Sequence, residues 1–317
     1  MTSGPTARVT QYHDALSVTF LGTGGSWPTA HRNVASIAVK RGPEVVLFDC
    51  GEGTQRQFQK SKLSYQQVSK IFVSHLHGDH FLGITGLVQT MSLNERADKL
   101  SIFGPRGLRG AISAMVSLGY FRPAFPVDVH ELKDKEVLDF GDYHVEARKI
   151  KHNVENFGYA LVEKSRPGRF NKERALELGV PEGPQFSRLH RGEDVTLADD
   201  RVVKSSDVVG SARLGRKIVY SGDAVPCEAM VELALEADLL IHDSTYGSDF
   251  PNPSEYGHST SQQAAWIAEK ANVDTLFLTH FSARYRDVDP LLADARKIHA
   301  KTEAAEDFRE HVVPFRE

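Results

Sequence analysis

From Leu16 onward the chain alternates between short apolar runs and longer segments of mixed polarity. The first runs predict β-strands over residues 17–21, 36–39 and 45–49. Later apolar runs, each bounded by turn residues, predict strands over residues 70–74, 100–103, 217–221, 238–242 and 275–279. Continuous runs such as Leu239-Leu240-Ile241 are typical of strands that are buried on both faces and covered by helices.

Segments with helical periodicity lie between these strands and predict helices over residues 81–93, 107–117, 228–237 and 261–271. Strands and helices therefore alternate in both halves of the chain, which predicts an α/β protein. The 317 residues lie near the upper limit for one hydrophobic core. We expect one large domain over residues 16–317, preceded by a polar, aperiodic segment, residues 1–15, that forms a flexible N-terminal arm.

Residues 163–192 interrupt this alternation. The segment contains seven Lys or Arg against four Glu, a net charge of +3, whereas the whole chain carries −4. Glycine and proline punctuate it, notably at Gly183-Pro184, and a short helix is expected over residues 172–178. The pattern is compatible with a solvated loop or with a protruding basic arm.

The composition excludes several classes of protein. With 40% hydrophobic and 25% charged residues, the chain has the balance of a soluble globular protein. Its two cysteines, Cys50 and Cys227, are too few for a disulfide framework or a four-cysteine zinc site, which favours a cytoplasmic location. No run approaches the roughly 20 apolar residues of a membrane span. The net charge of −4 confines any nucleic-acid contact to a local basic patch.

The strongest chemical signal is the string His75-Leu76-His77-Gly78-Asp79-His80, which follows a predicted buried strand and precedes a predicted helix. Buried imidazoles need partners for their nitrogen atoms, and divalent cations satisfy three imidazoles and a carboxylate together. In a tight loop, His75 and His77 can face one ion. Asp79 and His80 can then face a second ion about 3.5–4 Å away, as in two-metal sites.

Four local ligands cannot complete two metal shells, so more distant ligands are required. Asp223 and His280 each follow a predicted strand, and His152 follows the strand-like segment 143–150. Open α/β sheets assemble their sites beyond the carboxyl ends of the strands, so these three residues are candidates to converge on the His75 loop. Each of them alone could also be a turn or cap residue.

The HxHxDH string is followed along the chain by His258-Ser259-Thr260 and by Ser282-Ala283-Arg284-Tyr285. The HxHxDH string resembles the motif of the metallo-β-lactamase superfamily. The other two, with the basic segment and its Gly183-Pro184, resemble the ribonuclease Z family of tRNA 3′-processing endonucleases. The resemblance covers about residues 16–289. It implies a metallo-β-lactamase fold, a four-layer αβ/βα sandwich, with a protruding tRNA-binding arm inserted at about residues 163–192.

Carried over residue by residue, the resemblance implies two Zn²⁺ ions per chain. One ion would be bound by His75, His77, His152 and Asp223. The other would be bound by Asp79, His80, His280 and the shared Asp223. Asp79 would also orient the attacking hydroxide. Asp49, at the end of a strand, would hydrogen-bond a ligand histidine.

A different role is implied for His258, which would protonate the leaving 3′ oxygen. Its acidic partner would be Asp243, which stands where the family has a glutamate. Thr260 and Gln263 predict a capping box at the start of the helix over 261–271, which places the His258 imidazole beside a helix N-terminus. The alternative role of His258 is that of a hydrogen-bonded cap residue. The implied reaction is removal of 3′ trailers from precursor tRNA by hydroxide attack on a phosphodiester, which leaves a 3′-OH on the tRNA.

Substrate contacts are implied both near the metals and on the arm. The residues near the metals are Arg284 and Arg32, and Ala30 stands where the family loop usually has a lysine. The residues on the arm are Arg166, Arg169, Lys172, Arg174, Gly183 and Pro184. A homodimer is also implied, in which the arm of one subunit holds the tRNA that the other subunit cuts.

Two other classes of function remain open from the sequence. A hydrolase of a small ester or thioester, of the glyoxalase II or lactonase type, or another phosphodiesterase on the same fold, would use the same ligands without needing the arm. A catalytically inactive RNA-binding module is disfavoured because the ligand set is intact.

Overall fold

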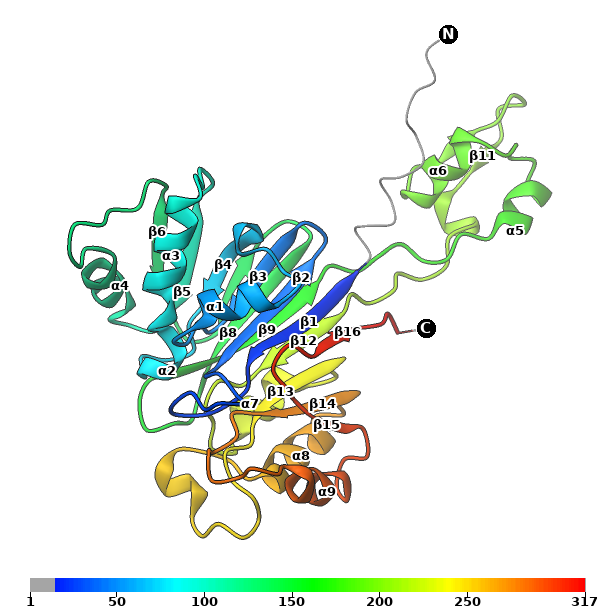
Figure 1. The fold of residues 1–317 in the computed structure, drawn as a ribbon. Helices are drawn as coiled ribbons and strands as arrows, with labels where there is room; N and C mark the ends of the chain where they lie inside the picture. The colour runs from blue at the N-terminus through cyan, green and yellow to red at the C-terminus, as the bar shows by residue number, and fades with distance from the viewer. Residues whose placement is uncertain (1–14, 317) are drawn as a thin grey trace.

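The computed structural model describes residues 15–316, so the predicted N-terminal arm lies outside the described residues except for Ala15. Two β-sheets pack face to face, and helices cover their outer faces (Figure 1). The strands of the first sheet are β1 (Leu16–Gly22), β2 (Ser36–Arg41), β3 (Glu44–Phe48), β4 (Val68–Phe72), β5 (Leu100–Gly104), β6 (Val127–Glu131) and β16 (Glu310–Val312). The strands of the second are β7 (Glu136–Asp139), β8 (Tyr143–Ile150), β9 (Asn156–Glu163), β12 (Lys217–Tyr220), β13 (Leu239–Asp243), β14 (Thr275–Thr279) and β15 (Thr302–Ala304).

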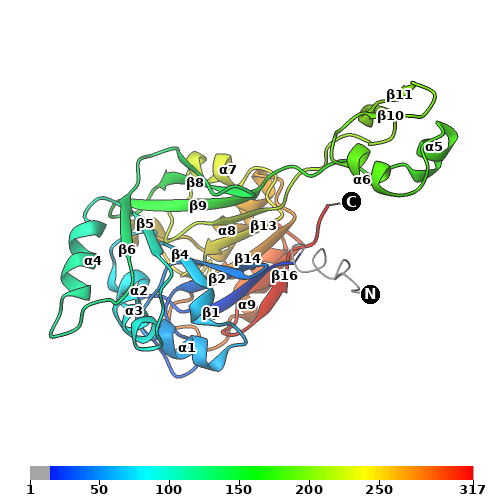
Figure 2. The same cartoon turned by 90° about the horizontal axis from the view of Figure 1, so that it is seen from above.

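The helices divide between the two outer faces (Figures 1 and 2). The first sheet is covered by α1 (Thr54–Lys60), α3 (Gly83–Leu93) and α4 (Leu108–Val116). The second sheet is covered by α7 (Glu228–Ala234), α8 (Ser261–Lys270) and α9 (Asp289–Arg296). The predicted four-layer sandwich is confirmed.

The predicted helix over 81–93 is split into α2 (Gly78–Phe81) and α3. Gly83 lies at the junction, where its N–H donates to the carbonyl of Cys50 at 3.0 Å. A Cβ atom on Gly83 would come within 1.9 Å of the Gly51 carbonyl oxygen, so only glycine allows this close approach. The junction therefore ties the helix start to the loop after β3. Among the described residues, no helix has both the length and the apolar character that crossing a membrane requires.

Central strands such as β1 and β13 are buried on both faces, which explains the continuous apolar runs in the sequence. Aromatic side chains fill the space between the sheets, where Phe48 stacks on Tyr159 with ring centroids 5.8 Å apart. Aliphatic side chains such as Leu87 and Leu240 pack under the helices on the outer faces. Apolar side chains thus pack between the two sheets and beneath the helices on each outer face. This close packing holds the loops at the sheet edges in fixed positions.

The strand directions bring the chemically important loops to one edge. Strands β3 and β4 are parallel, so Asp49 and His75, which follow them, emerge on the same side. Strands β8 and β12 are both antiparallel to β9, so His152 and Asp223 also follow strands that run in one direction. The parallel strand β14 brings His280 to the same edge as β12 and β13.

The arm is inserted between β9 and β12 and protrudes from the body (Figures 1 and 2). It contains α5 (Lys172–Glu177), α6 (Pro184–His190), β10 (Val195–Thr196) and β11 (Val202–Val203). The helix predicted over 172–178 is therefore present as α5. The insertion extends to Arg216, well beyond residue 192, where the prediction ended it. The reason is that Val195, Val203 and Val208 complete a small apolar core with Val180 and Leu189.

Candidate metal centre and active site

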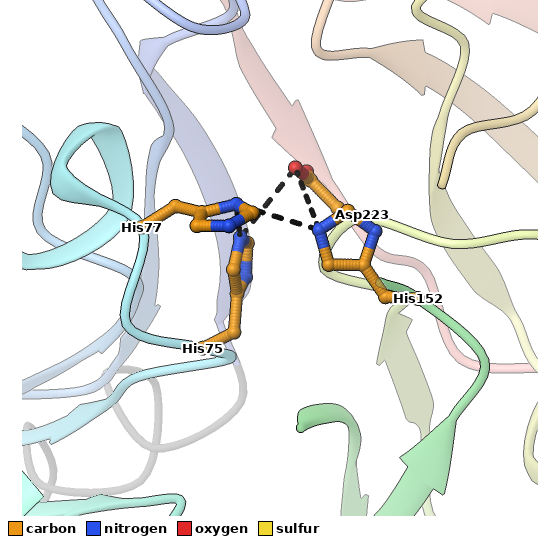
Figure 3. A group of neighbouring side chains, drawn as sticks. All are labelled: His75, His77, His152 and Asp223. Atoms are coloured by element: carbon orange, nitrogen blue, oxygen red, sulfur yellow. Dashed lines mark hydrogen bonds and ion pairs between the residues drawn. The ribbon is translucent and has the colours of Figure 1, made fainter. Parts of the chain in front are cut away.

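The seven side chains predicted as metal ligands converge at the shared edge of the two sheets. The first group is His75, His77, His152 and Asp223, whose ligand atoms all lie within 4.8 Å of one another (Figure 3). The second group is Asp79, His80 and His280, which meet the same distance limit. Figure 3 shows His75 and His77 on one chain segment facing His152 and Asp223 on two others.

Asp223 lies between the two groups and faces both. Its Oδ2 is 3.6 Å from His75 Nε2 and 4.0 Å from His152 Nε2. Its Oδ1 is 3.3 Å from His80 Nε2 and 3.2 Å from His280 Nε2. One carboxylate oxygen is thus directed at each group, which is the arrangement of a ligand that bridges two ions.

Four of the histidines are oriented by hydrogen bonds at the ring nitrogen that faces away from the centre. His152 Nδ1 bonds the Gly257 carbonyl oxygen at 2.7 Å, and His280 Nδ1 bonds Thr245 Oγ1 at 2.9 Å. His75 Nδ1 lies 3.0 Å from Ser74 Oγ. His80 Nδ1 bonds Asp49, as described next. Because each Nδ1 is engaged, each Nε2 is directed into the centre, as metal-ligating histidines require.

Asp49 is fully buried directly behind this centre. Its Oδ2 accepts hydrogen bonds from His80 Nδ1 at 2.7 Å, from the Tyr220 hydroxyl at 2.7 Å and from Ser74 Oγ at 2.8 Å. Its Oδ1 accepts from the Ser74 N–H at 2.6 Å. Asp49 therefore hydrogen-bonds His80, one of the histidines predicted as ligands.

The electrostatics of the centre favour neutral imidazoles that offer lone pairs. Burial lowers the pKa of His75, and it also lowers the pKa of His77 and of His152. His80 behaves differently. Burial opposes its charged form, but Asp223 and Asp49 outweigh burial and raise the pKa of His80 well above its ordinary value. The two buried carboxylates thus place His80 in surroundings that favour positive charge.

The donor set fits divalent cations. Among the described residues, His80 Nε2 and Asp223 Oδ1 are buried side-chain atoms without a hydrogen-bond partner, and both face the centre. Leaving such atoms unsatisfied costs free energy. A cation between them would satisfy both atoms at once. Imidazole nitrogens with carboxylate oxygens are the ligands of catalytic zinc and related divalent ions.

His258 and Asp243 form a hydrogen-bonded pair beside the second group, with Nδ1 and Oδ2 2.9 Å apart. Asp243 is fully buried, and its carboxylate also accepts from the N–H of Thr245 at 2.8 Å and of Ala224 at 3.1 Å. Burial opposes the charge on His258, but Asp243 raises its pKa to about 9. The side chain of Asp243 thus reaches His258, although it is one methylene shorter than the glutamate of the family. The predicted capping box of Thr260 and Gln263 is confirmed at the start of α8.

Proteins of known identity resemble this chain over most of its length. A protein named ribonuclease Z from Methanosarcina acetivorans is 47% identical over 303 residues, which cover 95% of this chain and 99% of that protein. Another with the same name, from Myxococcus xanthus, is 46% identical over 285 residues, covering 89% and 92% of the two chains. The chain belongs to the ribonuclease Z family.

Two further comparisons bear on this family assignment. The crystal structure of the short form of human tRNase Z superposes with a TM-score of 0.69 at 31% identity, covering 94% of this chain and 100% of that one. A family model described as "Anti-Pycsar protein Apyc1" matches residues 16–166. That match covers less than half of the chain and ends at the root of the arm, before Asp223, His258 and His280.

Several residues that support the centre of this ribonuclease Z family member were not predicted. Thr245 Oγ1 lies within 3.1 Å of both His258 Nδ1 and His280 Nδ1, so it links the His258–Asp243 pair to His280 of the second group. The Ser26 N–H donates to Asp79 Oδ2 at 2.8 Å. Gly257 has φ +84°, and a Cβ there would lie 2.5 Å from His152 Nδ1. The sequence feature that could have identified Gly257 is its position directly before His258.

The two arginines predicted to contact substrate near the metals are engaged differently. The Arg284 guanidinium packs over Phe250, 4.6 Å from the ring centroid. Phe250 belongs to the loop after β13, which also carries Tyr246 beside His258. The Arg32 guanidinium donates to Thr23 Oγ1 and to the Ala305 carbonyl, both at 2.7 Å. Its loop borders a hollow of about 390 Å³ that is also lined by Arg56 and Lys60. Those two cations were not predicted as site residues.

The predicted arm residues do not form one surface. Arg169, Lys172 and Arg174 are exposed, and the last two form ion pairs with glutamates of the arm at 2.8 and 3.0 Å. Gly183 and Pro184 begin α6. Arg166 instead lies at the root of the arm, where its guanidinium packs on the ring of Phe315.

Proposed function

We propose that this protein is a metal-dependent endoribonuclease that removes 3′ trailers from precursor tRNA. The observation that carries the proposal is the combination of a two-group metal centre with the His258–Asp243 pair, in a chain that also extends a separately packed arm. Membership in the ribonuclease Z family supports the same activity. The arm would contact phosphates of the tRNA body through shape and charge.

Two divalent cations held at this centre would supply a hydroxide at neutral pH and offset the charge of the scissile phosphodiester. We propose zinc for both, because imidazole and carboxylate ligands suit it. The first group would hold one ion and the second group the other, with Asp223 shared between them. Asp79, held by the Ser26 N–H, would orient the attacking water.

His258 would complete the reaction as the proton donor. Oxygen from water forms a bond to phosphorus, the bond from phosphorus to the tRNA 3′ oxygen breaks, and His258 gives that oxygen its proton. The products are a tRNA with a 3′-OH and a trailer with a 5′-phosphate. Asp243 holds the imidazole at Nδ1, so Nε2 is the nitrogen available to the leaving group.

On the arm, Arg169 and Lys172 line a hollow of about 600 Å³ that would receive the tRNA backbone. We also propose a homodimer. Its support is the family resemblance together with exposed apolar side chains at the end of α3 and after α4, where Leu93 is 79% and Leu118 is 65% exposed. A cytoplasmic location would keep the free thiols of Cys50 and Cys227 reduced. Light scattering of the purified protein would measure the subunit number.

The test compares two substrates. Residues 166–213 would be replaced by a short glycine-serine link, and turnover of a 3′-extended precursor tRNA and of bis(p-nitrophenyl) phosphate would be measured. We expect the variant to lose tRNA cleavage and to keep turnover of the small diester, because only the large substrate can use binding energy from the arm. A folded, metal-loaded variant that still processes tRNA at the parent rate would refute the role of the arm in binding tRNA. A parent protein that turns over the small diester but does not cut tRNA would favour a small-substrate hydrolase instead.

A further inference from the structure

The arm joins the body through a two-stranded stalk, residues 164–170 and 209–216. The stalk leaves the second sheet at the end of β9 and returns at the start of β12. Arg166 and Arg213 exchange two backbone hydrogen bonds of 2.8 and 2.9 Å, and the Asn171 N–H donates to the Val208 carbonyl at 2.7 Å. A two-stranded ribbon is weakly stabilised by itself and twists readily. The direction of the arm therefore depends on what packs against its root.

Phe315 packs against both strands of the stalk. The guanidinium carbon of Arg166, on the outgoing strand, lies 3.1 Å from the centroid of the Phe315 ring. The corresponding carbon of Arg216, on the returning strand, lies 3.8 Å from it. Contacts of this kind between a guanidinium and an aromatic ring are attractive and have a preferred geometry. A single ring thus contacts one arginine from each strand.

The segment that carries Phe315 is itself attached to the body. It follows β16 in the first sheet, and the N–H of the buried Val313 donates to the Leu16 carbonyl at 2.9 Å. The Val313 carbonyl accepts a hydrogen bond from Arg216 at 3.1 Å. Beyond the ring, Arg316 forms an ion pair with Asp238, which lies directly before β13 of the second sheet. Figures 1 and 2 both show the segment that follows β16 beside the root of the arm.

Arg216 is also held on its other side. It binds Glu163 through two hydrogen bonds of 2.7 and 2.9 Å, and Arg41 of β2 contacts the same carboxylate at 3.2 Å. Glu163 and Arg216 are both buried. The root of the arm is therefore connected to both sheets, and Phe315 is the point where the C-terminal segment meets both strands of the stalk.

We propose that Phe315 is a positioning residue that sets the direction of the arm relative to the metal centre. The consequence for activity rests on the function proposed above, in which the arm and the centre hold one tRNA at two distant points. Two contacts on one ligand reinforce each other only when their separation matches the span of the ligand. Releasing the stalk should therefore weaken tRNA binding without changing the chemistry at the centre.

The kinetic test uses Phe315→Ala, with Phe315→Trp as the conservative variant and Val312→Ala, at a 61% exposed position in β16, as the matched control. We expect Phe315→Ala to raise KM for precursor tRNA about tenfold, the scale of losing a well-formed cation–π contact. Its kcat, its metal content and its turnover of bis(p-nitrophenyl) phosphate should stay at parent values. Phe315→Trp should retain the parent KM, because tryptophan also accepts a guanidinium on its face.

A direct measurement follows the arm itself. Spin labels would be placed on cysteines introduced at the exposed Ser187 of α6 and Ala293 of α9, in a Cys227→Ser background. We expect one narrow distance distribution in the parent and a broader one after Phe315→Ala. An unchanged KM with an unchanged distribution would overturn the proposal. So would loss of metal and of small-diester turnover in Phe315→Ala, because that result would assign Phe315 to the folding of the body.

The two proposals fail in different ways. A parent protein that does not cut precursor tRNA would refute the proposed function. The distance distributions would still decide whether Phe315 sets the direction of the arm.

Discussion

Replacing Asp49 with asparagine tests whether the metal centre depends on the buried carboxylate behind it. The carboxylate accepts four hydrogen bonds, from Ser74 N–H, Ser74 Oγ, the Tyr220 hydroxyl and His80 Nδ1. An asparagine has one acceptor oxygen and one NH₂ group. If the asparagine oxygen takes the Oδ2 position, its NH₂ group faces one donor, the Ser74 N–H. If the oxygen takes the Oδ1 position, the NH₂ group faces the other three donors.

The structure sets the size of the expected effect. In the better orientation one buried donor loses its partner, which costs about 1–3 kcal/mol of unfolding free energy. The negative charge that holds His80 is also lost. Substitutions of residues that orient a metal ligand weaken metal binding by about 10- to 100-fold. This range corresponds to about 1.4–2.8 kcal/mol.

The assay titrates Zn²⁺ into metal-free protein in competition with a chromophoric chelator, and denaturant unfolding of the metal-free form follows stability. Asp128→Asn is the matched control, because Asp128 is an exposed carboxylate on β6 whose ion pair, in the described part of the chain, is with the exposed Lys99. We expect Asp49→Asn to lose metal affinity and stability by the amounts above and Asp128→Asn to keep both. Parent affinity in Asp49→Asn would refute the role assigned to this carboxylate.

Three further substitutions test other parts of the account. Gly257→Ala places a Cβ 2.5 Å from His152 Nδ1 and should weaken metal binding at least tenfold, whereas Gly110→Ala in α4, where the new Cβ meets nothing within 4 Å, should leave binding unchanged. His258→Ala should lower kcat on precursor tRNA by about 100-fold or more with metal content unchanged. For Glu163, burial opposes the charge but Arg216 lowers the pKa below the ordinary 4.5. The stabilisation of the fold by ionised Glu163 is therefore fully present above pH 4.5 and is lost as the pH falls through the lowered pKa. Glu163→Gln should flatten the acid side of the curve of unfolding free energy against pH.

Each of these predictions has a clear contrary result. Full metal affinity in Gly257→Ala would mean that the loop accommodates the methyl group without moving His152. Parent kcat in His258→Ala would assign the proton transfer to another group. Denaturant unfolding measured between about pH 3 and 7 would contradict the Glu163 prediction if the variant and the parent gave parallel curves.

The convergence of the candidate metal ligands could be predicted because their signal is local. His280 follows directly after a strand, and His75 and Asp223 each come three residues after the end of one. The carboxyl ends of parallel strands meet at one edge whatever the details of packing. The residues that orient these ligands could not be predicted in the same way. Thr245 and Ser74 are single hydroxyl residues in loops, and their role depends on which ring the fold brings within reach.

The extent of the arm was underestimated for a related reason. Its second half contains β10 and β11, which have two residues each, too short for an alternating pattern to be recognised. Its small core depends on valines spread from Val180 to Val208. The contact of Phe315 with Arg166 and Arg216 joins residues about 100 and 150 positions apart, so only the folded chain reveals it.

The most direct test of the central claim is to map the ends of the products formed from a 3′-extended precursor tRNA. We expect one endonucleolytic cut near the 3′ end of the mature tRNA sequence, with a 3′-OH on the tRNA and a 5′-phosphate on the trailer, and no cut after the metal is removed by a chelator. An intact precursor in the presence of metal-loaded protein, or stepwise shortening of the trailer from its 3′ end, would contradict it.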